Sequence, residues 1–288
     1  MKLRLLLWLA LPVSLAAAEP ARKPDPIREF DAATLSRLGR QIYVHDQLAW
    51  RATDIVMAQI GLDRLQKDGG RGWIIDDSNR EAPLVRFLRM GPDGPESLCD
   101  ITFAKGKEPE IGVPTDRTLT GPQRAQAAAL ETAKARFMQG DLAWCGGAPN
   151  TVVLADPDGY GFLVYFLRAK PAAEKIPVGG HYRFTVSADG GKVEQVDRLF
   201  ASCLTMDKRT PDGSTLEMMV ASHVISPTPL ETHVFLSLQE GIPFMITTMD
   251  GMAWGIEKGE LSKMGSLEKL LKKQETKAAK PSTKKSKK

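Results

Sequence analysis

Two histidines and a glutamate lie close together in the segment SHVISPTPLETHVF, residues 222–235. If the Pro-Thr-Pro sequence at 227–229 forms the loop of a β-hairpin, His223 lies opposite His233 in the strand ladder. Glu231 then shares their face, because side chains alternate along a strand. Two imidazoles and a carboxylate with an open fourth position are the ligand set of a catalytic zinc ion. The segment therefore predicts a candidate zinc site of a metal-dependent hydrolase at His223, Glu231 and His233.

The same segment also allows a simpler interpretation. A change of one residue in loop length would move His223 to the opposite face from His233. Histidines on the polar face of an antiparallel sheet are more often solvated or hydrogen-bonded than bound to a metal. His181, in GGHYRF, would add a further ligand only if its strand lay alongside. We therefore expect structural histidines more often than a metal site from this pattern.

The chain has three cysteines, and we expect Cys145 and Cys203 to form a disulfide bond. Each of these two lies at the edge of a strand-like run in the second half, and Cys99 is left over. The alternative is three reduced and buried thiols. The pairing is expected only if the chain is exported, since the cytosol keeps thiols reduced.

Recognised catalytic motifs are absent from the sequence. It contains no Gly-x-Ser-x-Gly, no phosphate-binding loop and no dinucleotide fingerprint. His45 and Asp46 are adjacent on a predicted helix, but neighbouring helical side chains point about 100° apart and do not form a dyad. The pattern favours a non-catalytic binding, inhibitory or envelope-accessory protein of unknown ligand. The alternative is the metal-dependent hydrolase, for which zinc would be the cofactor.

The N-terminus has the pattern of a cleaved secretory signal. Lys2 and Arg4 precede an apolar run, and Ala16-Ala17-Ala18 provides the small residues that a signal peptidase accepts. We expect a signal peptide over residues 1–18, a Pro-rich leader over 19–31, and a periplasmic or secreted protein.

Charge is distributed unevenly along the chain. Residues 269–288 contain nine lysines and one glutamate, so the formal net charge of +4 conceals an acidic body. We expect a disordered, solubilising tail without a partner. The alternative is weak electrostatic contact of this tail with an anionic membrane or cell-wall surface. Nucleic acid is not an expected partner, because the tail has no aromatic residue on which bases could stack.

Segments whose apolar residues recur with the periodicity of a helix are followed by segments with the periodicity of a strand. This order of segments predicts an α+β fold. Apolar spacing predicts a long helix over 32–65, and a Thr120–Gln123 capping box begins a second helix over 122–138. Three strands separate these helices, at 72–76, 83–90 and 97–106. Strand-like runs with short connections follow, including LETHVFLSLQ at 230–239, which favours antiparallel neighbours.

This element order predicts two helices packed on a mostly antiparallel, meander-like sheet, as in cystatin-like and NTF2-like folds. The expected units are 32–118, a helix with three strands, and 119–260, a helix with an antiparallel sheet. These two units could equally form one domain. A short helix from Leu261 and the lysine-rich tail make up 261–288.

The segments GGHYRFTVSADGGKV and SPTPLETHVFLSL resemble exported bacterial proteins that have no assigned activity. The resemblance covers roughly Asn150 to Glu257. It implies export and the α+β fold, and it supplies no catalytic residue.

Overall fold

The computed structural model describes residues 26–210, 213–214 and 216–278. The expected signal peptide and residues 279–288 of the lysine-rich tail lie outside the described residues. Within the described ranges the chain forms the following helices and strands in order: α1 (Ala32–Gln59), α2 (Leu62–Lys67), β1 (Gly70–Asp76), β2 (Leu84–Gly91), β3 (Gly94–Thr102), β4 (Glu110–Gly112), α3 (Gly121–Phe137), β5 (Asn150–Ala155), β6 (Gly161–Leu167), β7 (Lys175–Pro177), β8 (Tyr182–Ser187), β9 (Val193–Arg198), β10 (Thr205–Asp207), β11 (Met219–His223), α4 (Glu231–Glu240), β12 (Phe244–Thr248), β13 (Met252–Glu257), β14 (Glu260–Ser266) and α5 (Leu267–Ala278).

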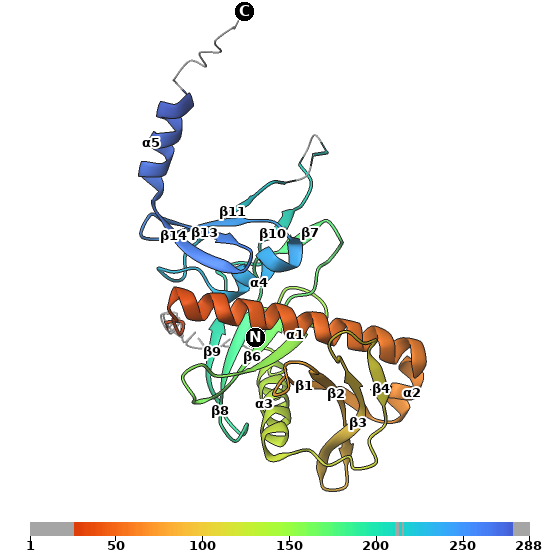
Figure 1. Cartoon of the computed structure of the whole chain (residues 1–288). Helices are drawn as coiled ribbons and strands as arrows, with labels where there is room; N and C mark the ends of the chain where they lie inside the picture. Colours follow the sequence, from red (N-terminus) through yellow and green to blue (C-terminus); the bar gives the residue numbers. More distant parts are fainter. Residues whose placement is uncertain (1–25, 211–212, 215, 279–288) are drawn as a thin grey trace, which may run out of the picture.

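The strands form three four-stranded sheets, β1-β2-β3-β4, β5-β6-β8-β9 and β11-β12-β13-β14, together with a short β7-β10 ladder (Figure 1). Neighbouring strands are antiparallel except β11 and β12, which are parallel. The predicted α+β class and the mostly antiparallel sheet structure are therefore confirmed. The more specific cystatin-like or NTF2-like arrangement stays a prediction, and the strands are divided among separate sheets rather than joined in one meander.

Helix α1 connects the hydrophobic cores of the molecule (Figure 1). It begins at Asp31, whose side chain accepts a hydrogen bond from the Thr34 amide. Leu38 and Ile42, near its N-terminus, belong to a core shared with the β5–β6 strands, α4 and the β11–β14 sheet. Val56, near its C-terminus, packs in a separate core with β2 and β3. A single long helix thus fixes the position of the first sheet relative to the other two.

The β5-β6-β8-β9 sheet is buried on both faces. Leu163 and Tyr165 point into the core shared with α1, whereas Val164 and Phe166 point into the core formed with α3. This alternation follows from the period of two along a strand. Helix α3 begins with the predicted capping box between Thr120 and Gln123.

Helices α1 and α4 cross at a very short distance because residue 39 is glycine. A Cβ atom at Gly39 would lie 2.4 Å from Val234 Cβ and 2.7 Å from the Glu231 carbonyl oxygen. Contacts this close leave no room for a side chain. The first turn of α4 is therefore held directly against α1.

The predicted β-hairpin around 227–229 is wrong. Strand β11 ends at His223, and residues 231–240 form helix α4, which packs against both α1 and β13. Nearly every α4 side chain from Glu231 to Ser237 is buried, so the segment lacks the polar face that would reveal helical periodicity. Short apolar runs of this kind are compatible with either a strand or a buried helix.

Two further sequence predictions need correction. The C-terminal helix begins at Leu267 rather than Leu261, because residues 260–266 complete the last sheet as β14. The first half also has a fourth strand, β4, paired with β3. No helix within the described ranges has the length and apolar character needed to cross a bilayer.

Candidate functional site

The fold brings His223 and His233 together even though the hairpin does not form. His223 ends β11 and His233 lies in the first turn of α4. Their ring centroids are 5.0 Å apart in a T-shaped arrangement, and the Phe200 ring lies 6.0 Å from each. Both imidazoles are buried.

One nitrogen of each imidazole has an assigned partner. His233 Nδ1 accepts a hydrogen bond of 2.9 Å from the Leu230 amide. The Ser226 hydroxyl donates to the Thr228 carbonyl, so at 2.7 Å it accepts from His223 Nε2. Within the described part of the chain, His223 Nδ1 and His233 Nε2 have no hydrogen-bond partner. Burial lowers the pKa of His223 to about 4 and holds the pKa of His233 well below its ordinary value, so both rings are neutral at pH 7.

Glu231 does not join the two histidines. Its carboxylate accepts hydrogen bonds from Arg183 Nη1 at 2.6 Å and from the Tyr165 hydroxyl at 3.0 Å. Arg183 also donates to Asp197 Oδ2 through Nε at 3.0 Å and Nη2 at 2.7 Å. The described residues contain no group of three or more histidine, cysteine, aspartate or glutamate side chains arranged to hold a metal ion. The convergence of His223, Glu231 and His233 on which the hydrolase hypothesis depended is therefore not formed.

The third buried histidine, His181, uses both of its ring nitrogens within the fold. Nδ1 accepts a hydrogen bond from the Arg168 amide at 3.0 Å, and Nε2 donates to the Pro177 carbonyl at 2.7 Å. Burial lowers its pKa to about 4. His181 is thus a structural residue in the strand-rich centre of the molecule.

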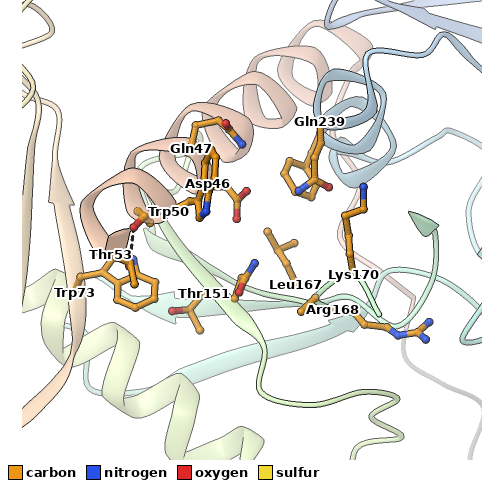
Figure 2. A pocket seen from close by; sticks show the side chains of 14 residues that line it. Asp46, Gln47, Trp50, Thr53, Trp73, Thr151, Leu167, Arg168, Lys170 and Gln239 are labelled. Atoms are coloured by element: carbon orange, nitrogen blue, oxygen red, sulfur yellow. Dashed lines mark hydrogen bonds between the residues drawn. The ribbon is translucent and has the colours of Figure 1, made fainter. Parts of the chain in front are cut away.

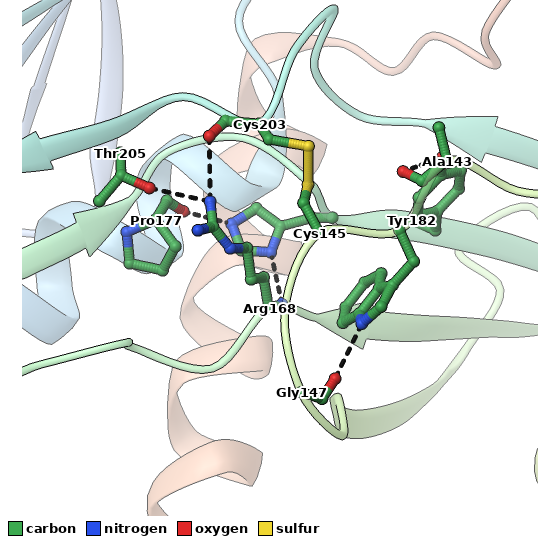
Figure 3. The surroundings of a disulfide bond; sticks show 10 residues. Ala143, Cys145, Gly147, Arg168, Pro177, Tyr182, Cys203 and Thr205 are labelled. Atoms are coloured by element: carbon green, nitrogen blue, oxygen red, sulfur yellow. Dashed lines mark hydrogen bonds between the residues drawn. A yellow bond between two sulfur atoms is a disulfide. The ribbon is translucent and has the colours of Figure 1, made fainter.

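The predicted disulfide bond between Cys145 and Cys203 is present (Figure 3). It joins the segment before β5 to the segment after β9, across 58 residues of sequence. Arg168 lies beside it, and its Nη1 donates to the Cys203 carbonyl at 3.1 Å and the Thr205 hydroxyl at 2.9 Å. Cys99 is a buried thiol, and burial raises its pKa to about 11.

A pocket of about 550 Å³ lies between α1, β1, the β5–β6 strands and α4 (Figure 2). It combines aromatic, amide and ionisable side chains. Its polar, charged and indole side chains include Asp46, Gln47, Trp50, Trp73, Asn150, Lys170 and Gln239. Figure 2 shows the side chains of Asp46 and Gln239, from α1 and α4, pointing toward the same space.

Asp46 carries the carboxyl group of the pocket. It is 8% exposed, and burial raises its pKa from 3.8 to about 6, against the lowering effect of a hydrogen bond with Asn150. None of the ion pairs among the described residues involves Asp46. Its neighbour His45 points elsewhere and lies 3.2 Å from Asp77 Oδ2, so the two do not form a dyad, as expected. Asp46 therefore presents a poorly solvated carboxyl group to the pocket.

Two tryptophans belong to the apolar part of the pocket wall, together with Leu167 and Phe235. Trp50 lies one turn after Asp46 on α1 and is 59% exposed. Trp73 comes from β1, where its ring packs 6.0 Å from Phe87. An exposed indole has a large apolar face and one N–H donor, which suits it to ligands with apolar and polar sides.

Lys170 brings a cation to the opposite wall, but its charge is already balanced. Its Nζ lies 2.8 Å and 2.9 Å from the two carboxylate oxygens of Glu240, a side chain that is itself buried. Lys208 makes a further contact of 3.0 Å with the same carboxylate. The pocket thus has one carboxyl without an ion pair among the described residues, and the Lys170 cation in its wall is paired with Glu240.

Comparison with protein-family models, curated proteins and solved structures gives no match to this chain.

This pocket was not predicted from the sequence. Asp46 and Trp50 have the spacing of four that places two residues on one face of a helix, and this was the available signal. Trp73 and Asn150 come from separate sheets, and no sequence pattern places them beside α1. The second set of residues that the sequence did not reveal is the buried Arg183 network.

Proposed function

We propose that this chain is an exported, non-catalytic binding protein whose pocket at Asp46 and Trp50 holds a saccharide. The observation that carries the proposal is the combination of Trp50 and Trp73 with a poorly solvated carboxyl and three amide side chains in one pocket. The N-terminal sequence and the Cys145–Cys203 disulfide support export, since such bonds persist in oxidising compartments.

Saccharides fit this combination of side chains. A pyranose ring has a C–H face that can pack on an indole, and hydroxyl groups that both donate and accept hydrogen bonds. Gln47, Asn150 and Gln239 carry amides with both functions, and Asp46 accepts from a hydroxyl. A few placed polar groups within a partly apolar cavity are the usual composition of a small-molecule site.

Binding is favoured over hydrolysis because the pocket has a single carboxyl. Most glycoside hydrolases use two carboxyl groups on either side of the scissile bond, one as acid and one as base or nucleophile. Among the residues that line the pocket, Asp46 is the only one with a carboxyl group. With its raised pKa, Asp46 can act as a proton donor. The lining has no second carboxyl group to act as the base or nucleophile.

The proposal is tested by titrating the chain from residue 19 onward with oligosaccharides built from glucose and from N-acetylglucosamine. Tryptophan fluorescence and calorimetry would detect binding. We expect Trp50→Ala to weaken binding about tenfold or more, since loss of an indole contact costs more than about 1.4 kcal/mol. The matched control is Tyr160→Ala, which removes an aromatic ring that is 68% exposed and remote from the pocket. Absence of binding by the whole panel, or equal weakening by both variants, would refute the saccharide site.

A further inference from the structure

Strand β11 forms one edge of the β11-β12-β13-β14 sheet and pairs with β12 alone (Figure 1). The Met219 amide donates at 2.9 Å to the carbonyl of Pro243, the residue before β12. Successive residues of a strand turn their N–H and C=O groups to alternate sides, so those of Val220 and Ser222 point away from β12. Among the described residues, these outward groups have no hydrogen-bond partner. The edge is therefore open to a further strand.

The side chains along this edge do not protect it from pairing. Monomeric proteins usually protect an edge strand with lysine or other charges, with proline, with a bulge, or with a helix or loop that covers it. The segment from Met218 to Ser226 contains no aspartate, glutamate, lysine, arginine or proline. Its ladder with β12 is regular. Met218, Val220 and Val224 are 46%, 49% and 52% exposed, so the uncharged edge faces solvent.

The other edge of the same sheet, β14, is protected. The Leu261 amide donates to the Ser36 hydroxyl of α1 at 2.9 Å, and β14 packs against α1. Strand β14 also carries Glu260 and Lys263, and its ladder with β13 is irregular at Ala253. Of the two edges, β11 is thus the one suited to strand pairing with another molecule.

The β11 edge is complementary to a second copy of itself. An antiparallel pairing with Ser222 on a two-fold axis places Val220 of each copy opposite Val224 of the other. The outward groups of Val220 and Ser222, and those of Val224 directly after the strand, then all fall in hydrogen-bonded pairs, in which opposed residues exchange both bonds. Two pairs of β-branched side chains meet across the interface, and neither copy brings a charge to it.

We propose that two copies of this chain associate through their β11 edges and join their β11–β14 sheets into one continuous sheet of eight strands. A second copy is the occupant because one symmetry axis satisfies every outward group of the edge and matches uncharged side chains with uncharged side chains. A single strand pair buries less than the roughly 1,200 Å² of a stable interface, so the dimer is weak and reversible. The inference is independent of the saccharide pocket, to which β11 contributes no residue.

Sedimentation velocity of the chain from residue 19 onward, over roughly 1–200 μM, tests for association. We expect the mass to rise from that of a monomer toward that of a dimer. Val220→Lys should raise the dissociation constant about tenfold or more, because it places a lysine from each copy in the interface. Val113→Lys is the matched control, since it makes the same change at a residue that is 63% exposed after β4, and it should leave the dissociation constant unchanged.

Cross-linking tests the register of the pairing. On the proposed axis the two Ser222 Cα atoms lie about 5.5 Å apart, a separation that a disulfide bond can span. Ser222→Cys should therefore give a covalent dimer when oxidised glutathione is added, seen on a non-reducing gel. The matched control is Ser262→Cys, at an exposed residue of β14, which should remain monomeric on that gel.

A monomeric mass for the wild type over the whole concentration range would overturn the inference. Equal dissociation constants for Val220→Lys and Val113→Lys would also overturn it, because the copies would then meet through another surface. Equal cross-linking of the two cysteine variants, or none in Ser222→Cys, would exclude the paired edge. Thermal unfolding would verify the fold of each variant. If Val220→Lys does not fold, the cross-linking comparison still decides the question.

Discussion

Two carboxyl groups of this molecule are removed from water in opposite ways. Glu231 is fully buried and accepts hydrogen bonds from Arg183 and Tyr165. Asp46 is almost as buried but lies at the wall of a pocket, with no ion pair among the described residues. The first carboxylate is paired with a cation through Oε1, although its Oε2 has no hydrogen-bond partner among the described residues. The second has no cationic partner, and burial raises its pKa. Glu231 therefore contributes to the ion-pair network of the fold. Asp46 is the carboxyl group of the proposed saccharide site.

Arg183 is the centre of the compensated region. Besides Glu231 and Asp197, it donates to the Arg28 carbonyl, and its guanidinium lies 4.9 Å from the Phe30 ring centroid. These contacts tie the segment before α1 and the first turn of α4 to strand β8. Burial alone would lower the pKa of Arg183, but the charges of its acidic neighbours outweigh this and raise it. A permanently charged Arg183 is therefore the partner that keeps Glu231 and Asp197 stable inside the protein.

The largest expected effect comes from breaking this compensated network. Arg183→Met should lower the free energy of unfolding by about 3–5 kcal/mol, because it leaves buried carboxylates without their cation. Denaturant unfolding monitored by circular dichroism would measure the change. The matched control is Arg209→Met, at a side chain that is 69% exposed, which should change stability by less than ~0.5 kcal/mol. Similar losses in both variants would mean that Glu231 and Asp46 do not differ in the way proposed.

A smaller effect of opposite sign on the free energy of unfolding is expected at Asp46. Asp46→Asn should raise the free energy of unfolding at pH 7.5 by roughly 2–3 kcal/mol, since the shift from 3.8 to about 6 is a cost of ionising this group in the folded state. Asp54→Asn, at an exposed position of the same helix, is the control and should be nearly neutral. A destabilised Asp46→Asn would show that the carboxylate is compensated after all.

The pH dependence of this effect has a definite sign. Between pH ~4 and pH ~6 the folded protein binds a proton at Asp46 more tightly than the unfolded chain does, so this contribution to stability falls as pH rises. The stability difference between Asp46→Asn and the wild type should therefore grow through that window and stay constant above it. Unfolding curves at several pH values would test this directly.

The smallest expected effect is the contribution of the buried His223 to the loss of stability at acidic pH. Its sign is opposite to that of Asp46. Burial lowers the pKa of His223 in the folded state to about 4. Below pH 6.5 the unfolded chain therefore binds a proton at this histidine and the folded protein does not, so the free energy of unfolding falls as pH falls. His223→Leu should remove about 1.4 kcal/mol of the stability lost between pH 7.5 and pH 5.5. Equal acid slopes for the variant and the wild type would show that His223 is solvated in the folded state.

Local patterns in the sequence were sufficient for much of the fold. The capping box at Thr120 predicted α3, and the glycines in the turns predicted most strands within a few residues. The helix predicted over 32–65 is interrupted after Gln59, and α2 is a separate helix. The Cys145–Cys203 pair followed from the expected compartment and the positions of the strands. Helix α4 was misassigned because its buried surface goes almost all the way round, so neither period is distinct.

The candidate site depended on contacts that sequence spacing does not encode. His223 and His233 were expected to be neighbours and are, but through a parallel strand and a helix rather than a hairpin. Glu231 was expected beside them, and one helical turn instead directs it to Arg183, forty-eight residues away. The sequence by itself determined which side chains can ionise and where most of the helices and strands lie. Only the tertiary structure decided which of these ionisable side chains are desolvated and which form ion pairs. Desolvation and pairing depend on neighbours that come from distant parts of the chain.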